Sequence, residues 1–112
     1  FINDKINPPS QDVLNYGKQL STLVIANTVE MDKLIKKRSK NWDFNRIMLI
    51  DKLILRMALI EMIYIEEVPH KVSITEGVEI AKEYSTEDSS SFINGILDSV
   101  YNDVIINKEK II

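Results

Sequence analysis

The chain contains no cysteine, and His70 is its only histidine. Without cysteine it can form neither a disulfide framework nor a thiolate metal site, and one histidine cannot by itself hold zinc. The sequence also lacks the GxxxxGK, GxGxxG, HExxH and GxSxG patterns that bind phosphates, dinucleotides or zinc, or that carry a serine nucleophile. We therefore predict no catalytic residue, no metal and no cofactor. A chain without cysteine suits a reducing compartment, so we expect it in the cytoplasm.

Glycine and proline are scarce, with three of each, so few positions interrupt a helix. The run from Ile47 to Ile65 contains neither, and nineteen residues form a helix of about 28 Å. Its length approaches the ~20 residues of a membrane span, but its four charged residues, Asp51, Lys52, Arg56 and Glu61, would each be costly in a bilayer. Because the run is apolar nearly all round, we interpret it as the buried central helix of an all-α domain.

Further helices are predicted on both sides of this run. Ser10 follows two prolines and is a suitable N-cap for a helix of about 25 residues. Its apolar or small stripe consists of Val13, Gly17, Leu20, Val24, Thr28, Met31 and Ile35. Another helix is predicted over 72–84, with a last one from the N-cap Thr86 to about Ile106. The predicted fold is therefore a helical bundle of about four to five helices around a central buried helix.

We expect residues 1–112 to form a single domain, with an N-terminal segment at 1–9 and a frayed tail at 107–112. Because the chain opens with Phe1 and not Met, we also expect it to be a piece of a longer protein. The first and central helices carry more apolar residues than the other helices can cover. An exposed apolar strip should follow, and with it self-association or the binding of further helices.

Several single residues carry structural expectations. Gly17 is expected to pack closely against a neighbour, and Trp42 to anchor the turn before the central helix. Asp43 or Asn45 is expected to cap that helix. The plentiful carboxylates fall at outward helix positions, so no carboxylate pair with shifted pKa values is predicted.

The charge of the chain is unevenly distributed around its net value of −3. Residues 1–56 hold ten Lys or Arg against six Asp or Glu, whereas residues 57–103 hold two against ten. The basic side is densest in KLIKKRSK, residues 33–40, which includes Lys36 and Lys37. Two interpretations remain open: a solvated helix end that complements the helix dipole, or a surface that contacts phosphate.

Motifs over about residues 40–100 resemble the NusB family of bacterial transcription antitermination factors. The family's LR-ALxE signature is similar to Leu55-Arg56, Ala58-Leu59 and Glu61, and its VPxKVxINEAVELAK segment to the stretch that begins at Val68. Its EDSxxFVNGVLD motif is similar to Glu87-Asp88-Ser89 and Phe92 to Asp98. The motifs stand in the family's order and spacing.

The resemblance implies an all-helical RNA-binding fold. It implies binding of the boxA element of ribosomal RNA leader transcripts, together with the small-subunit ribosomal protein NusE, within the RNA polymerase antitermination complex. By position, Asp88, Ser89 and Phe92 match the family's RNA surface, and Tyr84 matches a family aromatic. Each also has a structural interpretation: Asp88 can serve as a first-turn helix acid, and Phe92 as core.

Two other functions remain open. NusB-like domains also occur as the RNA-binding part of ribosomal RNA cytosine methyltransferases, in which a catalytic domain follows the helical one. A purely structural helical module without RNA binding is the second alternative.

Overall fold

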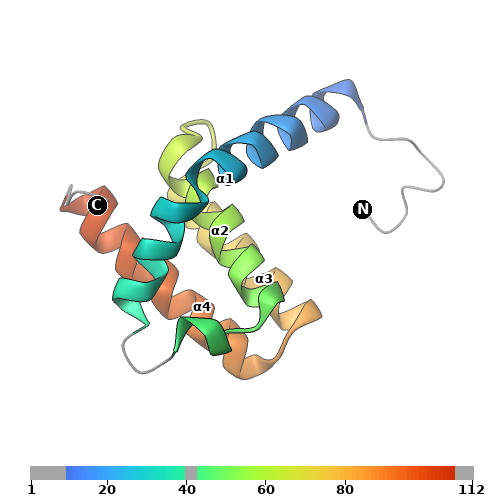
Figure 1. The fold of residues 1–112 in the computed structure, drawn as a ribbon. Helices are drawn as coiled ribbons and strands as arrows, with labels where there is room; N and C mark the ends of the chain where they lie inside the picture. Colours follow the sequence, from blue (N-terminus) through green and yellow to red (C-terminus); the bar gives the residue numbers. More distant parts are fainter. Residues whose placement is uncertain (1–9, 40–42, 108–112) are drawn as a thin grey trace.

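The computed structural model describes residues 10–39 and 43–107, and its elements are all helical. They are α1 (Gln11–Arg38), the short 3₁₀ helix η1 (Phe44–Arg46), α2 (Leu49–Tyr64), α3 (His70–Tyr84), α4 (Glu87–Val100) and the π-helical turn η2 (Tyr101–Ile106). The predicted all-α class and bundle are confirmed (Figure 1). Trp42, the N-terminal segment 1–9 and the tail beyond 107 carry predictions that lie outside the described residues.

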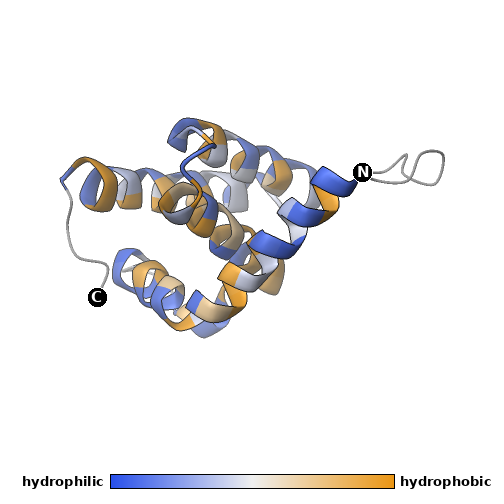
Figure 2. Ribbon diagram, turned by 90° about the horizontal axis from the view of Figure 1, so that it is seen from above, coloured by the Kyte–Doolittle hydropathy of each residue, from blue (hydrophilic) through white to orange (hydrophobic). Residues whose placement is uncertain are grey.

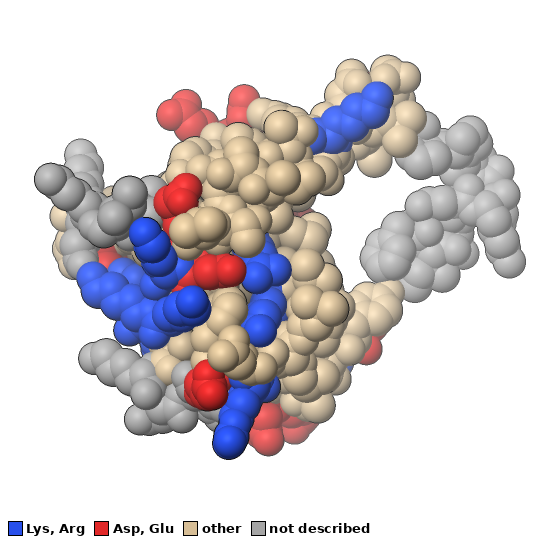
Figure 3. Space-filling model, viewed as in Figure 1, with Lys and Arg blue, Asp and Glu red and all other residues tan. Residues whose placement is uncertain are grey.

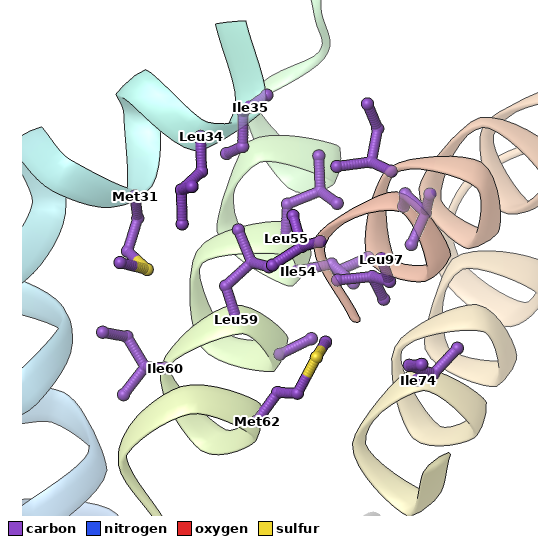
Figure 4. Packing of buried hydrophobic residues seen from close by; sticks show 14 of the residues in the cluster. Met31, Leu34, Ile35, Ile54, Leu55, Leu59, Ile60, Met62, Ile74 and Leu97 are labelled. Atoms are coloured by element: carbon purple, nitrogen blue, oxygen red, sulfur yellow. The ribbon is translucent and has the colours of Figure 1, made fainter. Parts of the chain in front are cut away.

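The core lies between α2 and the three other long helices. Leu55, Leu59, Ile60 and Met62 of α2 are at most 1% exposed. They meet fully buried side chains from α1, including Met31, and from α4 (Figure 4). The other fully buried partners include Leu34, Ile35, Ile93, Leu97 and Val100. In Figure 2 the outer faces of the helices are mainly hydrophilic, as expected for helices that share one core.

The central helix is not buried all round, and this part of the sequence prediction is wrong. Leu49, Leu53 and Met57 on one side of α2 are 67%, 41% and 45% exposed. Three helices pack on α2, and together they leave this side open. The predicted exposed apolar strip is therefore present in the structure. No helix among the described residues is both long and apolar enough to cross a membrane.

Helix α1 is bent at Asn27, whose backbone angles (φ −118°, ψ 15°) leave the helical range. The Asn27 side-chain amide donates to the Leu23 carbonyl at 2.8 Å, and the Thr28 hydroxyl donates to the Val24 carbonyl at 2.6 Å. Side chains that hydrogen-bond back to the preceding turn are a known cause of helix bending. The bend separates a C-terminal half with fully buried side chains from an N-terminal half, residues 11–26, which we call the arm (Figure 1). The arm contacts the core through the half-buried Leu20, Leu23 and Val24.

The arm departs from the predicted buried stripe. Val13 is 60% exposed, and a Cβ placed on Gly17 would have no atom within 4 Å, so the expected close packing at Gly17 is wrong. The close approach occurs instead at Gly77 of α3. A Cβ there would lie 3.2 Å from Leu97 Cδ1 and 3.4 Å from Ala58 Cβ. Gly77 therefore lets α2, α3 and α4 meet closely.

Two of the three predicted N-caps are present in the structure. The hydroxyl of Ser10 accepts from the Val13 amide at 3.2 Å, and that of Thr86 accepts from the Ser89 amide at 3.0 Å. Asp43 instead caps η1, where it accepts from the Asn45 amide at 3.0 Å. Helix α2 begins after Met48 without a side-chain cap, so the expected capping of the central helix is wrong.

Candidate nucleic-acid interface

A cavity of about 210 Å³ opens beside the start of α4, and we call it the α4 pocket. Its walls come from η1, the start of α2 and the first turns of α4. The lining residues are Arg46, Ile47, Met48, Asp51, Thr86, Asp88, Ser89 and Phe92. The structure therefore brings Asp88, Ser89 and Phe92 together in one pocket. Tyr84, 45% exposed at the end of α3, does not line it.

The α4 residues contribute different groups to this pocket. Asp88 is exposed in the first helical turn, where its charge complements the helix dipole. Ser89 is 8% exposed, and its hydroxyl accepts a hydrogen bond from Thr86 at 3.0 Å, so it is part of the cap. Phe92 is half-buried and packs against the core while it also lines the pocket. Its packing against the core agrees with the structural interpretation of Phe92, and its place in the pocket leaves part of the ring accessible.

Asp51 is the pocket residue that sequence reasoning missed. Its side chain is 4% exposed, and its Oδ1 has no hydrogen-bond partner among the described residues. A buried carboxylate oxygen without a donor is costly, and such a group calls for a ligand, water or ion to satisfy it. The signal in the sequence was an acid within the apolar run, close to the start of the helix.

Basic side chains approach the pocket across η1. The ammonium groups of Lys36 and Lys52 lie 4.9 and 4.4 Å from the centroid of the Phe44 ring, at cation–π distance. Arg46, two residues after Phe44, lines the pocket. We call Lys36, Lys37, Arg46 and Lys52 the basic surface. In Figure 3, Lys and Arg gather over the C-terminal half of α1 and the neighbouring part of α2.

Two other cations have structural partners. Arg38 is only 5% exposed and pairs with Asp103 at 3.1 Å, which ties α1 to η2. Within the described part of the KLIKKRSK run, the Arg38 side chain is therefore internal, whereas Lys33, Lys36 and Lys37 are exposed. Arg56 donates two hydrogen bonds to Asp32, at 2.8 and 3.0 Å, and joins α2 to α1.

A second cluster contradicts the prediction that the carboxylates merely point outward. The Tyr16 hydroxyl donates to Glu61, and the Ser73 hydroxyl donates to Glu61 Oε1 at 2.9 Å. Glu76 is hydrogen-bonded to the same carboxyl group. Burial, followed by this hydrogen bond, raises the pKa of Glu76 above its ordinary value. Burial and the hydrogen bond to Glu61 also raise the pKa of Tyr16. The cluster shares no residue with the α4 pocket.

His70 begins α3, and its ring lies 5.8 Å from that of Tyr101 at 59°. Within residues 10–39 and 43–107, no three His, Cys, Asp or Glu residues gather as a metal site would require. The fold and the α4 pocket thus define a small all-helical module, with cationic side chains beside a cavity whose lining includes one aromatic and two acidic side chains.

Comparisons with known proteins identify the family to which this chain belongs. The NusB family model matches residues 1–102. The chain is 53% identical over 81 residues to the transcription antitermination protein NusB of Chloroherpeton thalassium, a match that covers 72% of this chain and 38% of that protein. The solved structure of T. maritima NusB superposes with a TM-score of 0.80 at 32% identity, covering 84% of this chain and 66% of that one. The chain belongs to the NusB family, and it spans only part of the length of both relatives.

Proposed function

We propose that the chain is the RNA-binding part of a bacterial transcription antitermination factor. It would act in the cytoplasm as one domain, on boxA-type elements of ribosomal RNA leader transcripts, with the small-subunit ribosomal protein NusE and the RNA polymerase antitermination complex as partners. Family membership supports the role in antitermination, and the C. thalassium relative bears that name. That relative is named as an antitermination protein and not as an enzyme, in keeping with a function that needs no catalysis.

The α4 pocket is the observation that carries this proposal. Phe92 offers an aromatic face on which a base can stack, and the carboxylates of Asp51 and Asp88 can accept hydrogen bonds from base amino groups or a ribose hydroxyl. The Oδ1 of Asp51 can accept such a hydrogen bond, because no donor in the described part of the chain pairs with it. These groups favour recognition of an unstacked base of single-stranded RNA over recognition of a duplex.

Phosphate contacts would come from the rim of the pocket. The basic surface supplies salt-dependent, sequence-independent attraction, and the free backbone N–H groups at the start of α4 suit phosphate oxygens. Tyr84, exposed at the end of α3, would add an aromatic face just before that helix start. The proposed RNA-contacting residues are therefore Asp88, Ser89, Phe92, Tyr84, Lys36 and Lys37, together with Asp51 and Arg46.

An RNA titration tests the proposal. A fluorescently labelled boxA-type RNA and a scrambled RNA of equal length would be titrated with the protein at several salt concentrations. Tighter binding of the boxA-type RNA, weakened by Asp51→Asn, supports base recognition in the α4 pocket. Equal affinity for the two RNAs, or an unchanged preference in the Asp51→Asn variant, contradicts it.

A NusB-like domain of a ribosomal RNA cytosine methyltransferase is the alternative function. It would use the same RNA surface, and the full-length gene separates the two functions. A methyltransferase domain encoded downstream supports the enzyme, whereas a stop codon supports the transcription factor. A purely structural module predicts no RNA binding at all in the titration.

A further inference from the structure

The aromatic ring of Phe44 is in contact with two cations that come from different helices. The ammonium group of Lys36, in the last turn of α1, lies 4.9 Å from the ring centroid. The ammonium group of Lys52, near the start of α2, lies 4.4 Å from the same centroid. One ring thus gathers two positive charges that lie apart in the sequence. Phe44 does not line the α4 pocket, so it has no part in the cavity proposed for a base.

The position of the Phe44 ring is set by the fold and not by the lysines. Its backbone lies in η1, which Asp43 caps by accepting from the Asn45 amide at 3.0 Å. The Phe44 carbonyl accepts from the Ile47 amide at 3.2 Å, which closes the turn. The side chain is half-buried and packs against the hydrophobic core. The ring is therefore a fixed platform, to which the longer lysine side chains adapt.

Neither lysine is neutralised by an acid. No ion pair within residues 10–39 and 43–107 includes Lys36 or Lys52. A cation–π contact holds an ammonium group through its charge, and the N–H groups that point away from the ring can still donate to an anion. A lysine side chain loses much rotamer freedom when a ligand immobilises it. Holding both ammonium groups in advance therefore lowers the cost of binding an anion.

We propose that Phe44 is a positioning residue for RNA, which holds Lys36 and Lys52 as a pair that contacts the phosphates of a single strand. This inference rests on the proposed RNA-binding function and deepens it, because it gives part of the basic surface a defined geometry. The ring is already in contact with two ammonium groups, so Phe44 orders the cations and is not a stacking face for a base. The pair supplies attraction that does not depend on the RNA sequence.

A double-mutant cycle tests the role of Phe44. A fluorescently labelled oligouridine carries the phosphate backbone without a boxA sequence, and it is titrated at low salt. The proteins are the wild type, Phe44→Leu, the pair variant Lys36→Met with Lys52→Met, and the combination of all three substitutions. We expect Phe44→Leu to weaken binding about fivefold in the wild type and to have no effect in the pair variant. An equal loss in both backgrounds, or no loss in the wild type, overturns the proposal.

The salt dependence of the same titration gives a second measurement, which does not need the pair variant. In Phe44→Leu the slope of log affinity against log salt should shrink by about 0.7 for each phosphate contact that is lost. An unchanged slope contradicts the positioning role. Phe44→Tyr keeps the ring and should keep both the affinity and the slope.

Tyr64→Leu is the matched control for the loss of an aromatic ring. Tyr64 is 39% exposed at the end of α2, and it makes no cation–π contact within the described residues. Its replacement should leave the affinity for oligouridine unchanged. Thermal melts establish that each variant is folded. Phe44→Met also fills the space against the core without a ring, and it repeats the test if Phe44→Leu is unstable.

The positioning role and the proposed function can fail separately. Equal affinity for boxA-type and scrambled RNA would contradict base recognition in the α4 pocket and would not alter the oligouridine cycle. A preserved boxA preference, with no effect of Phe44→Leu, would refute the positioning role alone. If Phe44→Leu lowered the boxA preference at an unchanged salt slope, the ring would be a stacking face and the proposal would be wrong. Absence of oligouridine binding at low salt would also refute it.

Discussion

Glu76 is the residue whose titration should be visible in the stability of the fold. Its pKa is raised above the ordinary 4.5, so the folded protein holds this proton more tightly than the unfolded chain. The resulting stabilisation is present below about pH 4.5 and is lost as the pH rises through the pKa of the folded state. Above that window, ionised Glu76 faces the carboxylate of Glu61, with Glu67 also near Tyr16.

Replacing Glu76 by glutamine should remove this loss, because the amide keeps a donor toward Glu61 at every pH. We expect Glu76→Gln to melt at a higher temperature than the wild type near neutral pH and at about the same temperature near pH 4. Melting temperatures measured across that pH range check this. Glu79 is exposed and pairs only weakly with Lys82, so it serves as the control. The melting temperature of Glu79→Gln should show no such pH-dependent difference from the wild type.

Phe92 carries a second prediction at this scale. Phe92→Leu keeps an apolar side chain against the core but removes the aromatic face in the α4 pocket. RNA affinity should fall by roughly 1–3 kcal/mol if one base stacks there, while the salt dependence stays unchanged. Fluorescence titration at several salt concentrations measures both quantities. A loss of RNA binding explained wholly by unfolding, seen in the thermal melt of the free variant, would assign Phe92 to the core alone.

Residue roles were predictable from the sequence where they depend on near neighbours. The cap formed by Thr86 joins positions three apart, and the sequence alone was sufficient to predict it. Asp51 and the Tyr16–Glu61 contact were missed, because burial and a partner 45 positions away depend on how the helices pack. The motif residues Asp88, Ser89 and Phe92 came from the family resemblance, and their RNA contacts stay a prediction.

At the scale of the helices, Gly77 sets the distance between α2, α3 and α4. Gly77→Ala would place a methyl group 3.2 Å from Leu97, which is fully buried and has little room to move. We expect a loss of about 1 kcal/mol in the free energy of unfolding, since overpacking outweighs the better helix propensity of alanine. Urea denaturation measures it.

Gly95→Ala provides the matched control within α4. A Cβ at Gly95 meets no atom within 4 Å, so only helix propensity changes, and the variant should gain about 0.5–1 kcal/mol. If both alanine variants were equally stabilised, the close approach at Gly77 would have no energetic consequence.

The helices themselves were largely predictable, since their apolar spacing and caps are local properties. The prediction ran the first helix through Asn27 without a bend and buried its whole stripe. The bend depends on two side chains that donate hydrogen bonds to carbonyl groups of the preceding turn. The periodic spacing of apolar residues does not predict such hydrogen bonds. The last helix does continue to Ile106, but its final turn is π-helical.

At the scale of the whole molecule, the uneven charge should govern the long-range attraction of RNA. The double substitution Lys36→Ala with Lys37→Ala removes two cations from the basic surface. The slope of log affinity against log salt should shrink by about 0.7 for each phosphate of single-stranded RNA that the variant no longer neutralises, with the preference for boxA-type RNA retained. Lys18→Ala with Lys82→Ala removes the same charge from the arm and α3, and should change the slope much less.

The bend in α1 also makes the arm a lever. From its pivot at Asn27, the arm extends over 16 residues, or about 24 Å, so a rotation of 10° displaces the tip at Gln11 by about 4 Å. Tyr16 holds this lever to Glu61 at about 16 Å from the pivot, far out along its length. Leu20, Leu23 and Val24 pack on the core nearer the pivot, so the hydroxyl of Tyr16 is the contact with the greater leverage over the position of the arm.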